Sequence, residues 1–111
     1  MILKKIVQTI KRHKRFLVTT HVNPDPDAIS GELAVAMYLK KLGKEVQVIN
    51  CEKIPKRFLF LPQASQIRSF DECRKKIFDV AIILDCGELN RIGRVQKLMA
   101  EDAFVINIDH Q

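Results

Sequence analysis

Four short apolar runs alternate with segments of helical periodicity in this chain, and this alternation restricts the fold more than any other feature. The runs predict strands over residues 16–20 (FLVTT), 46–49 (VQVI), 80–84 (VAIIL) and 104–108 (FVINI). Apolar residues at helical spacing predict an amphipathic helix over 2–13 and further helices over 28–42 and 94–100. We therefore expect an α/β fold with an open, mainly parallel β-sheet and helices on both faces.

The segment 50–70 is less regular, because Pro55 and Pro62 interrupt an apolar cluster, FLFL, that predicts a short helix or a turn. At 111 residues the chain is long enough for one domain that buries its own core. A metal bound here would therefore be expected to serve chemistry and not folding.

Composition narrows the cellular context and the partners. The formal net charge of +6 favours an anionic partner, although the basic N-terminal residues could equally form a solvated helix face. Three widely spaced cysteines argue against a disulfide framework or a zinc site, so we expect reduced thiols. Without a membrane-sized apolar run or a secretory signal, we expect a cytoplasmic protein with no membrane partner. Formation of a homodimer is left open.

Acidic residues and histidines follow three of the predicted strands at their carboxyl ends. The residues are His21, Asp25 and Asp27 after the first strand, Asp85 after VAIIL, and Asp109 and His110 after FVINI. Because parallel strands share one carboxyl edge, where open α/β folds place ligand crevices, we expect these groups to gather there.

Four gathered carboxylates would repel one another unless a cation neutralised them. Hard oxygen ligands with one or two imidazoles suit Mn²⁺ or Mg²⁺, with Fe, Co or Zn as alternatives. A shared carboxylate lets two ions approach to about 3.5–4 Å, the separation at which a pair activates water and clamps a phosphoryl group. The pattern therefore predicts a two-metal site for phosphoryl chemistry.

The segment HVNPDPDAIS at 21–30 carries half of this predicted site. Asn23 and Asp25 each precede a proline, which favours extended geometry, and alternate residues of an extended chain face the same way. Asp25 and Asp27 could thus present oxygens to one site. Ser30 is expected in the first turn of the following helix, where free amides could receive a phosphate.

Each of these residues also has an ordinary structural explanation. Asp27 could cap the helix over 28–42, Asp25 could be part of a turn, and His21 could be a hydrogen-bonded surface or core histidine. Arg91 or Arg94 could contact an anionic substrate, or either could be a solvated charge at a helix start. The coincidence of so many candidates at one predicted edge favours a site.

These residues lie in segments that resemble the motifs of the DHH family of phosphoesterases, over essentially the whole chain. HVNPDPDAISGELA resembles the first motif, His-x-x-x-Asp-x-Asp; LDCGELNRIG resembles the second, and IDH the start of Asp-His-His. NPDPDA, LKKLGKEVQVIN and PKRFLFLP resemble the branch of oligoribonucleases and phosphoadenosine-phosphate phosphatases, the nano-RNases. The resemblance implies that residues 1–111 are the N-terminal part of a DHH phosphoesterase domain, without the C-terminal substrate-binding domain.

The resemblance further implies a hydrolase that uses two Mn²⁺ ions, with Mg²⁺ or Co²⁺ as alternatives. Its substrates would be short single-stranded RNA or DNA oligonucleotides or nucleotide phosphates. The implied roles are metal ligation by His21, Asp25, Asp27, Asp85 and His110, with Asp85 bridging the ions; catalysis by Asp27, Asp85 and His110; support from Asp109; and substrate binding by Ser30 and Arg91.

The chain departs from the family pattern at Gln111, where the family has its second histidine. An amide cannot supply a proton as an imidazolium can. A later aspartate ligand of the family is also missing, so we expect a largely formed metal site with weak or no turnover. A non-catalytic metal- or nucleotide-binding module of the same fold is the alternative. A phospho-receiver-like domain is disfavoured, because Asp109 and His110 stand where receivers have a hydroxyl residue and a lysine.

Overall fold

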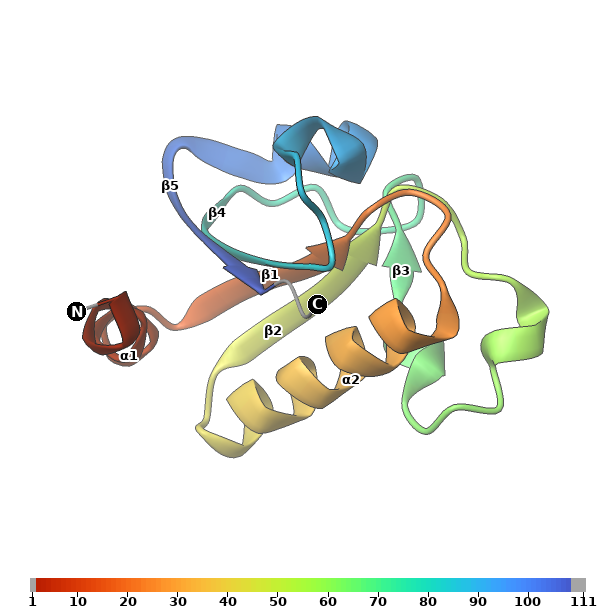
Figure 1. Cartoon of the computed structure of the whole chain (residues 1–111), viewed down its shortest axis with the longest axis horizontal. Helices are drawn as coiled ribbons and strands as arrows, with labels where there is room; N and C mark the ends of the chain where they lie inside the picture. Colours follow the sequence, from red (N-terminus) through yellow and green to blue (C-terminus); the bar gives the residue numbers. More distant parts are fainter. Residues whose placement is uncertain (1, 109–111) are drawn as a thin grey trace.

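A computed structural model describes residues 2–108, and side chains from Lys4 onward. Five strands form one sheet in the order β3–β2–β1–β4–β5, and every neighbouring pair is parallel (Figure 1). The strands are β1 (Arg15–Thr20), β2 (Glu45–Asn50), β3 (Arg68–Ser69), β4 (Phe78–Leu84) and β5 (Met99–Ile108). The predicted α/β fold is confirmed, and the sheet is wholly parallel.

Helical segments cover both faces of the sheet, as expected. They are α1 (Ile2–Arg12), α2 (Pro26–Lys41) and three 3₁₀ segments, η1 (Lys56–Phe58), η2 (Ala64–Gln66) and η3 (Leu89–Leu98). On one face, Val18 and Ile82 pack with Ile29 of α2, and Ile6 of α1 lies against the same cluster. On the other face, residues of η3 pack against Leu17 and Ile83. Figure 1 shows α2 and η3 on opposite sides of the strands.

The chain order of the strands reverses between β1 and β4. From β1 the chain continues outward through β2 and β3, then returns to β4 on the other side of β1. Such a point in an open parallel sheet leaves a crevice outside the carboxyl ends of the two central strands. The loops that follow β1 and β4 therefore flank the natural ligand position of this fold.

The helix predicted over 94–100 is correct in part: residues 94–98 are helical, but they belong to a 3₁₀ segment and not to an α-helix. The segment is η3, which runs from Leu89 to Leu98 and is interrupted at Gly93, where φ is 67° and ψ is −141°. Met99 already belongs to β5, which starts five residues before the predicted strand. A glycine in this conformation ends a helical turn, and no α-helix of useful length fits between it and the strand.

The start of α2 is defined by Asp25 and Pro26, two residues before the predicted helix. Asp25 is the N-cap, and its Oδ1 accepts a hydrogen bond of 2.8 Å from the Ala28 amide. Pro26 occupies the first helical position, where its missing N–H has no cost. The suggestion that Asp27 caps this helix is wrong; it lies in the first turn, where its charge complements the helix dipole.

Three smaller expectations concern the loop after β2, the cysteines and membrane-spanning helices. The FLFL cluster contributes Phe58 to η1, in agreement with a short helix. Cys51, Cys73 and Cys86 are free thiols. Between residues 2 and 108, no helix combines the length and the apolar character needed to cross a membrane.

We expect Gly93→Ala to lower the free energy of unfolding. A Cβ at this position would lie 2.7 Å from the Cys51 Sγ, and the backbone has positive φ. Strain of this kind costs about 1–3 kcal/mol, to which the overlap adds. The measurement is urea unfolding of the purified chain.

The matched control is Gly87→Ala, where an added Cβ meets nothing within 4 Å. Its effect should stay within about 0.5 kcal/mol of wild type. Equal effects of the two substitutions would contradict this explanation of Gly93.

Candidate functional site

The loop between β1 and α2 begins with His21, whose ring has a defined orientation. Its Nδ1 lies 2.7 Å from the Val22 carbonyl oxygen. Because a carbonyl oxygen only accepts, this contact places a proton on Nδ1 and leaves Nε2 as the ring nitrogen for a metal ion. Metal-binding histidines commonly make this type of second contact.

The same loop is attached to η3. The Val22 amide donates a hydrogen bond of 2.8 Å to the Arg91 carbonyl oxygen. Gly93 allows this part of η3 to lie close to the loop, since a Cβ there would lie 3.4 Å from Val22 Cγ1. Arg91 itself is exposed, so its guanidinium lies in solvent near the His21 loop.

The expectation that Asp25 and Asp27 are alternate residues of an extended chain is wrong. Asp25 is extended, as the following proline requires, with φ −86° and ψ 173°. Helix α2 begins at the next residue, so Asp27 is helical. Asn23 also departs from the prediction, with a left-handed φ of 55° that asparagine tolerates better than most residues.

Ser30 lies in the second turn of α2 and not in the first. Because the helix begins at Pro26, an amide at position 30 bonds to the carbonyl four residues earlier. The expected phosphate contact through the Ser30 amide is therefore wrong. Its side chain is exposed, and a contact through the hydroxyl stays a prediction.

The ends of β1, β4 and β5 are joined by hydrogen bonds. The buried Thr20 Oγ1 donates to the Leu84 carbonyl oxygen at 2.6 Å, which links β1 to β4. The Asp85 amide donates to the Ile108 carbonyl oxygen at 2.9 Å, which links β4 to β5. Asp85 has a left-handed φ of 51°, a conformation in which aspartate is enriched among non-glycine residues.

The sequence continues from Ile108 directly into Asp109, His110 and Gln111. These three residues lie outside the part of the chain that the structure describes. Their predicted roles, including metal ligation and catalysis by His110, stay predictions.

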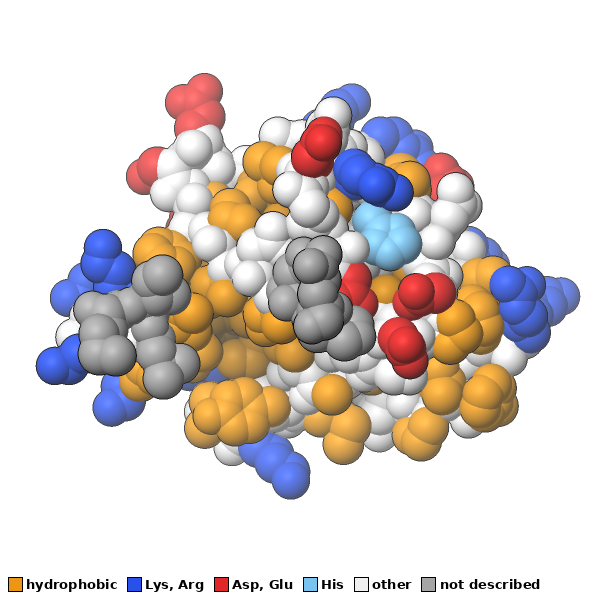
Figure 2. Space-filling view, viewed as in Figure 1, with side chains coloured by type: hydrophobic (Ala, Val, Ile, Leu, Met, Phe, Trp, Pro, Cys, Tyr) orange, Lys and Arg blue, Asp and Glu red, His pale blue; other side chains and the backbone are white. Residues whose placement is uncertain are grey.

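Asp27 and Asp85 line one cavity of about 400 Å³, although 58 positions separate them in the sequence. Gly31, Leu84 and Ile108 contribute to its wall, so the cavity lies where α2 meets the ends of β4 and β5. The predicted convergence of remote aspartates at one edge is present for this pair. Figure 2 shows acidic side chains beside a histidine on this face of the molecule.

The donor chemistry of this edge fits a hard divalent ion, because carboxylate oxygens and an imidazole are suitable ligands for Mn²⁺ or Mg²⁺. Within residues 2–108, however, no three His, Cys, Asp or Glu side chains are grouped closely enough to hold one metal ion. The cavity supplies Asp27 and Asp85. Participation of His21 and Asp25 in one shell with them stays a prediction.

Of the two candidate arginines, Arg94 has a structural role. Its Nη1 donates to Asp71 at 2.8 Å, and its Nη2 donates to the Cys51 carbonyl oxygen at 3.3 Å. Its guanidinium carbon lies 5.0 Å from the centroid of the Phe70 ring. The hydrogen bond to Asp71 is the main reason that the pKa of Arg94 is raised. Arg91 is therefore the better candidate for a substrate contact.

A basic cavity that the sequence analysis missed lies beyond β2 and beside β3. It has a volume of about 620 Å³, and Lys53, Lys56 and Arg68 line it together with Glu72. Glu72 accepts a hydrogen bond from the Ser69 hydroxyl and lies 3.5 Å from the Lys53 Nζ. Three cations against one carboxylate leave an excess of positive charge. The clustering of basic residues between positions 53 and 68 was the available signal.

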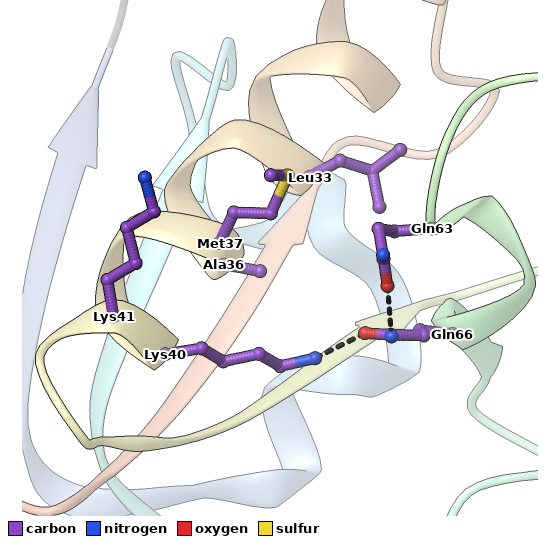
Figure 3. Close-up of a pocket in the computed structure, with 7 residues that line it drawn as sticks. All are labelled: Leu33, Ala36, Met37, Lys40, Lys41, Gln63 and Gln66. Carbon is purple, nitrogen blue, oxygen red and sulfur yellow. Dashed lines mark hydrogen bonds between the residues drawn. The ribbon is translucent and has the colours of Figure 1, made fainter.

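Another cavity, of about 300 Å³, lies between the later turns of α2 and η2 (Figure 3). Lys40 donates to Gln66, and Gln66 donates to Gln63, across its opening. Its lining residues are Leu33, Ala36, Met37, Lys40, Lys41, Gln63 and Gln66. It contains neither acidic residues nor histidines, and we assign it no part in the candidate site.

Comparisons with known proteins identify the family. The model of the DHH family, N-terminal domain, matches residues 15–111. The chain belongs to the DHH family. It is 38% identical over 96 residues to the bifunctional oligoribonuclease and PAP phosphatase NrnA of Thermus thermophilus, a match over 84% of this chain and 26% of that protein.

A solved structure supports the same assignment of fold. The exopolyphosphatase-related protein of Bacteroides fragilis matches with a TM-score of 0.85 and 26% identity, over 97% of this chain and 34% of that chain. The DHH chain described here thus spans about a quarter of the curated relative and a third of the structural one.

Substitutions at Asp25 should separate its role as helix cap from its predicted role as metal ligand. Asparagine caps helices as well as aspartate does, but it lacks the negative charge. We expect Asp25→Asn to keep the wild-type free energy of unfolding and to weaken Mn²⁺ binding. Asp25→Ala should weaken Mn²⁺ binding and also destabilise the fold by about 1 kcal/mol.

Isothermal titration calorimetry measures Mn²⁺ binding, and urea unfolding measures the free energy of unfolding. Wild-type Mn²⁺ affinity in Asp25→Asn would show that Asp25 is a cap and not a ligand.

Proposed function

We propose that this chain carries the metal-binding half of a phosphoesterase that hydrolyses short oligoribonucleotides or nucleotide phosphates. Membership of the DHH family and the similarity to NrnA support a hydrolase of this class. The observation that carries the proposal is the shared cavity of Asp27 and Asp85, where α2 meets the carboxyl ends of β4 and β5.

In this proposal, His21, Asp25, Asp27, Asp85 and His110 hold two Mn²⁺ ions, and Mg²⁺ or Co²⁺ could substitute. Such ions supply the positive charge that activates water and neutralises the phosphoryl oxygens. The protein fixes the positions of the ligands. The hydrogen bonds from Thr20 to Leu84 and from Asp85 to Ile108 hold the strand ends from which the ligands project.

Positive charge near the His21 loop and near the ends of β2 and β3 supports an anionic substrate. Arg91 lies next to the loop of His21, and the guanidinium geometry matches a phosphate group. The basic cavity of Lys53, Lys56 and Arg68 adjoins β2 and β3, on the far side of β1 from β4. Neighbouring strands are about 4.8 Å apart, so β3 lies about 14 Å from β4, and an oligonucleotide of several nucleotides is needed to place one phosphate in this cavity while another lies near Asp85.

A non-catalytic metal- or nucleotide-binding module is the second candidate. The presence of Gln111 in place of the second motif histidine favours it, because glutamine cannot donate a proton as a general acid.

The test is hydrolysis of a diribonucleotide and of phosphoadenosine phosphate in the presence of Mn²⁺, together with Mn²⁺ calorimetry. Asp85→Asn should reduce Mn²⁺ affinity and turnover by more than about 100-fold, since loss of an outer-shell partner alone costs about 10–100-fold. The matched control is Asp79→Asn, because Asp79 is exposed at the amino end of β4, opposite the end that Asp85 follows.

Equal affinities of the two variants would contradict the proposed site. Mn²⁺ binding without hydrolysis in wild type, with hydrolysis gained in Gln111→His, would identify the module as an enzyme impaired at that position. Mn²⁺ binding with hydrolysis in neither protein would show that Gln111 alone does not account for the lack of turnover.

The basic cavity leads to a separate prediction about oligonucleotide affinity. Lys53→Ala and Arg68→Ala should each weaken binding of a fluorescent trinucleotide and reduce the slope of log K against log salt by about 0.7. Lys97→Ala is the control, because this exposed lysine lies at the end of η3, which covers the face of the sheet opposite α2. Fluorescence anisotropy over a range of KCl concentrations measures both quantities. The same salt-dependence slope in wild type, the two cavity variants and the Lys97→Ala control would exclude the cavity from the oligonucleotide-binding surface.

A further inference from the structure

Glu32 of α2 is fully buried, which is unusual for a charged residue type. Its Oε1 accepts a hydrogen bond of 3.0 Å from Asn50 Nδ2. The Asn50 Oδ1 in turn accepts a hydrogen bond of 3.3 Å from the Thr19 hydroxyl. The second carboxyl oxygen, Oε2, is buried and has no hydrogen-bond partner among the residues that the structure describes.

These three side chains connect α2 with the carboxyl ends of two strands. The register of β1 with β2 runs from Arg15–Glu45 to Val18–Val48, and Thr19 and Asn50 lie just beyond it. The hydrogen bonds therefore join β1 and β2 where the backbone pairing of these two strands stops. Asp27 and Glu32 lie five residues apart in α2, so this connection attaches to the sheet the same helix that carries Asp27.

Burial makes Glu32 a neutral group at pH 7. Desolvation raises its pKa from the ordinary value of 4.5 to about 8, against the opposing effect of the Asn50 hydrogen bond. The nearest large cluster of buried side chains on this face is apolar. A leucine would fill similar space without a polar group to bury, so the carboxyl is better explained by the hydrogen bond that it makes.

The charged groups of the neighbouring elements lie at other places along them. Arg15 of β1 and Glu45 of β2 pair with each other at the amino ends, at 4.0 Å, and Asp79 of β4 is exposed at its amino end. The remaining titratable groups of these elements and of the loops that follow them are Asp27, Tyr38, Lys40 and Lys41 of α2, Lys44 after α2, His21 and Asp25 after β1, Cys51, Glu52 and Lys53 after β2, and Asp85, Cys86 and Glu88 after β4.

We propose that Glu32 is a positioning residue, whose hydrogen bond to Asn50 holds the first turns of α2 on the ends of β1 and β2 and thereby places Asp25 and Asp27. The catalytic importance of this placement rests on the proposed function. The placement itself does not, because it is a property of the loop and the helix start.

Hydrogen exchange of the backbone amides at 21–31 tests the placement without metal or substrate. Glu32→Gln keeps a neutral side chain of the same shape that can accept from Asn50, and exchange should stay within about 3-fold of wild type. Glu32→Leu removes the hydrogen bond, and exchange in this segment should accelerate by about 10-fold, equivalent to about 1.4 kcal/mol of local opening. Amides of β4 serve as the internal reference.

Asn50→Ala should accelerate exchange in the same segment, and the double variant Glu32→Leu with Asn50→Ala should be no worse than either alone, because both remove one interaction. Unchanged exchange in Glu32→Leu would overturn the proposal, as would a Glu32→Gln protein as altered as Glu32→Leu. If Glu32→Leu does not fold, the exchange rates of Glu32→Gln and Asn50→Ala, compared with wild type, still test the proposal. Absence of Mn²⁺ binding by wild type would defeat the proposed function and leave this result intact.

The pH dependence of stability gives a second readout. Between about pH 4.5 and 8 the folded protein keeps the Glu32 proton that the unfolded chain loses. The free energy of unfolding of wild type should therefore fall, relative to Glu32→Gln, as pH rises through this window. Parallel curves for the two proteins would show that Glu32 is not held neutral and would overturn the proposal.

Discussion

The parallel pairing of β1 with β4 determines where the functional groups of this chain lie. It brings the loop after Thr20 beside the loop after Leu84, and the hydrogen bond between these two residues fixes the two ends together. The strand order reverses between β1 and β4, and in open parallel sheets a ligand crevice lies outside the carboxyl ends at such a point. Asp27, in the helix that follows β1, and Asp85, directly after β4, line one cavity, and the similarity to the solved exopolyphosphatase-related protein is a similarity of fold.

The features that could be predicted from sequence are those set by local pattern and strand direction. VAIIL is apolar at every position, as expected of a strand buried on both faces, and β4 is such a strand. Once the strands were assigned as parallel, the carboxyl-end position of Asp27 and Asp85 followed without any knowledge of contacts. Their common cavity therefore required only the strand map and the direction of each strand.

The features that could not be predicted depend on competition between neighbouring residues or on tertiary contacts. Either Asp25 or Asp27 could cap a helix, and Pro26 decides in favour of Asp25 because proline fits the first helical position. That shift of two residues moves Ser30 out of the first turn. The role of Gly93 depends on Cys51, which is remote in sequence, and the basic cavity combines side chains from a loop and from β3. No local pattern contains these contacts.

Asp25 illustrates how structural and functional demands can fall on one carboxylate. Its Oδ1 already accepts the Ala28 amide, so the position and rotation of the carboxyl group are set by the helix start before any cation binds. A ligand held in this way loses less conformational freedom on binding than a free side chain does. Glu32, which is fully buried, attaches the same helix to the sheet through its hydrogen bond with Asn50. The rigidity of the predicted ligand loop thus arises from hydrogen bonds that are part of the fold, which explains how a short segment with two prolines can serve as a preorganised edge of a site.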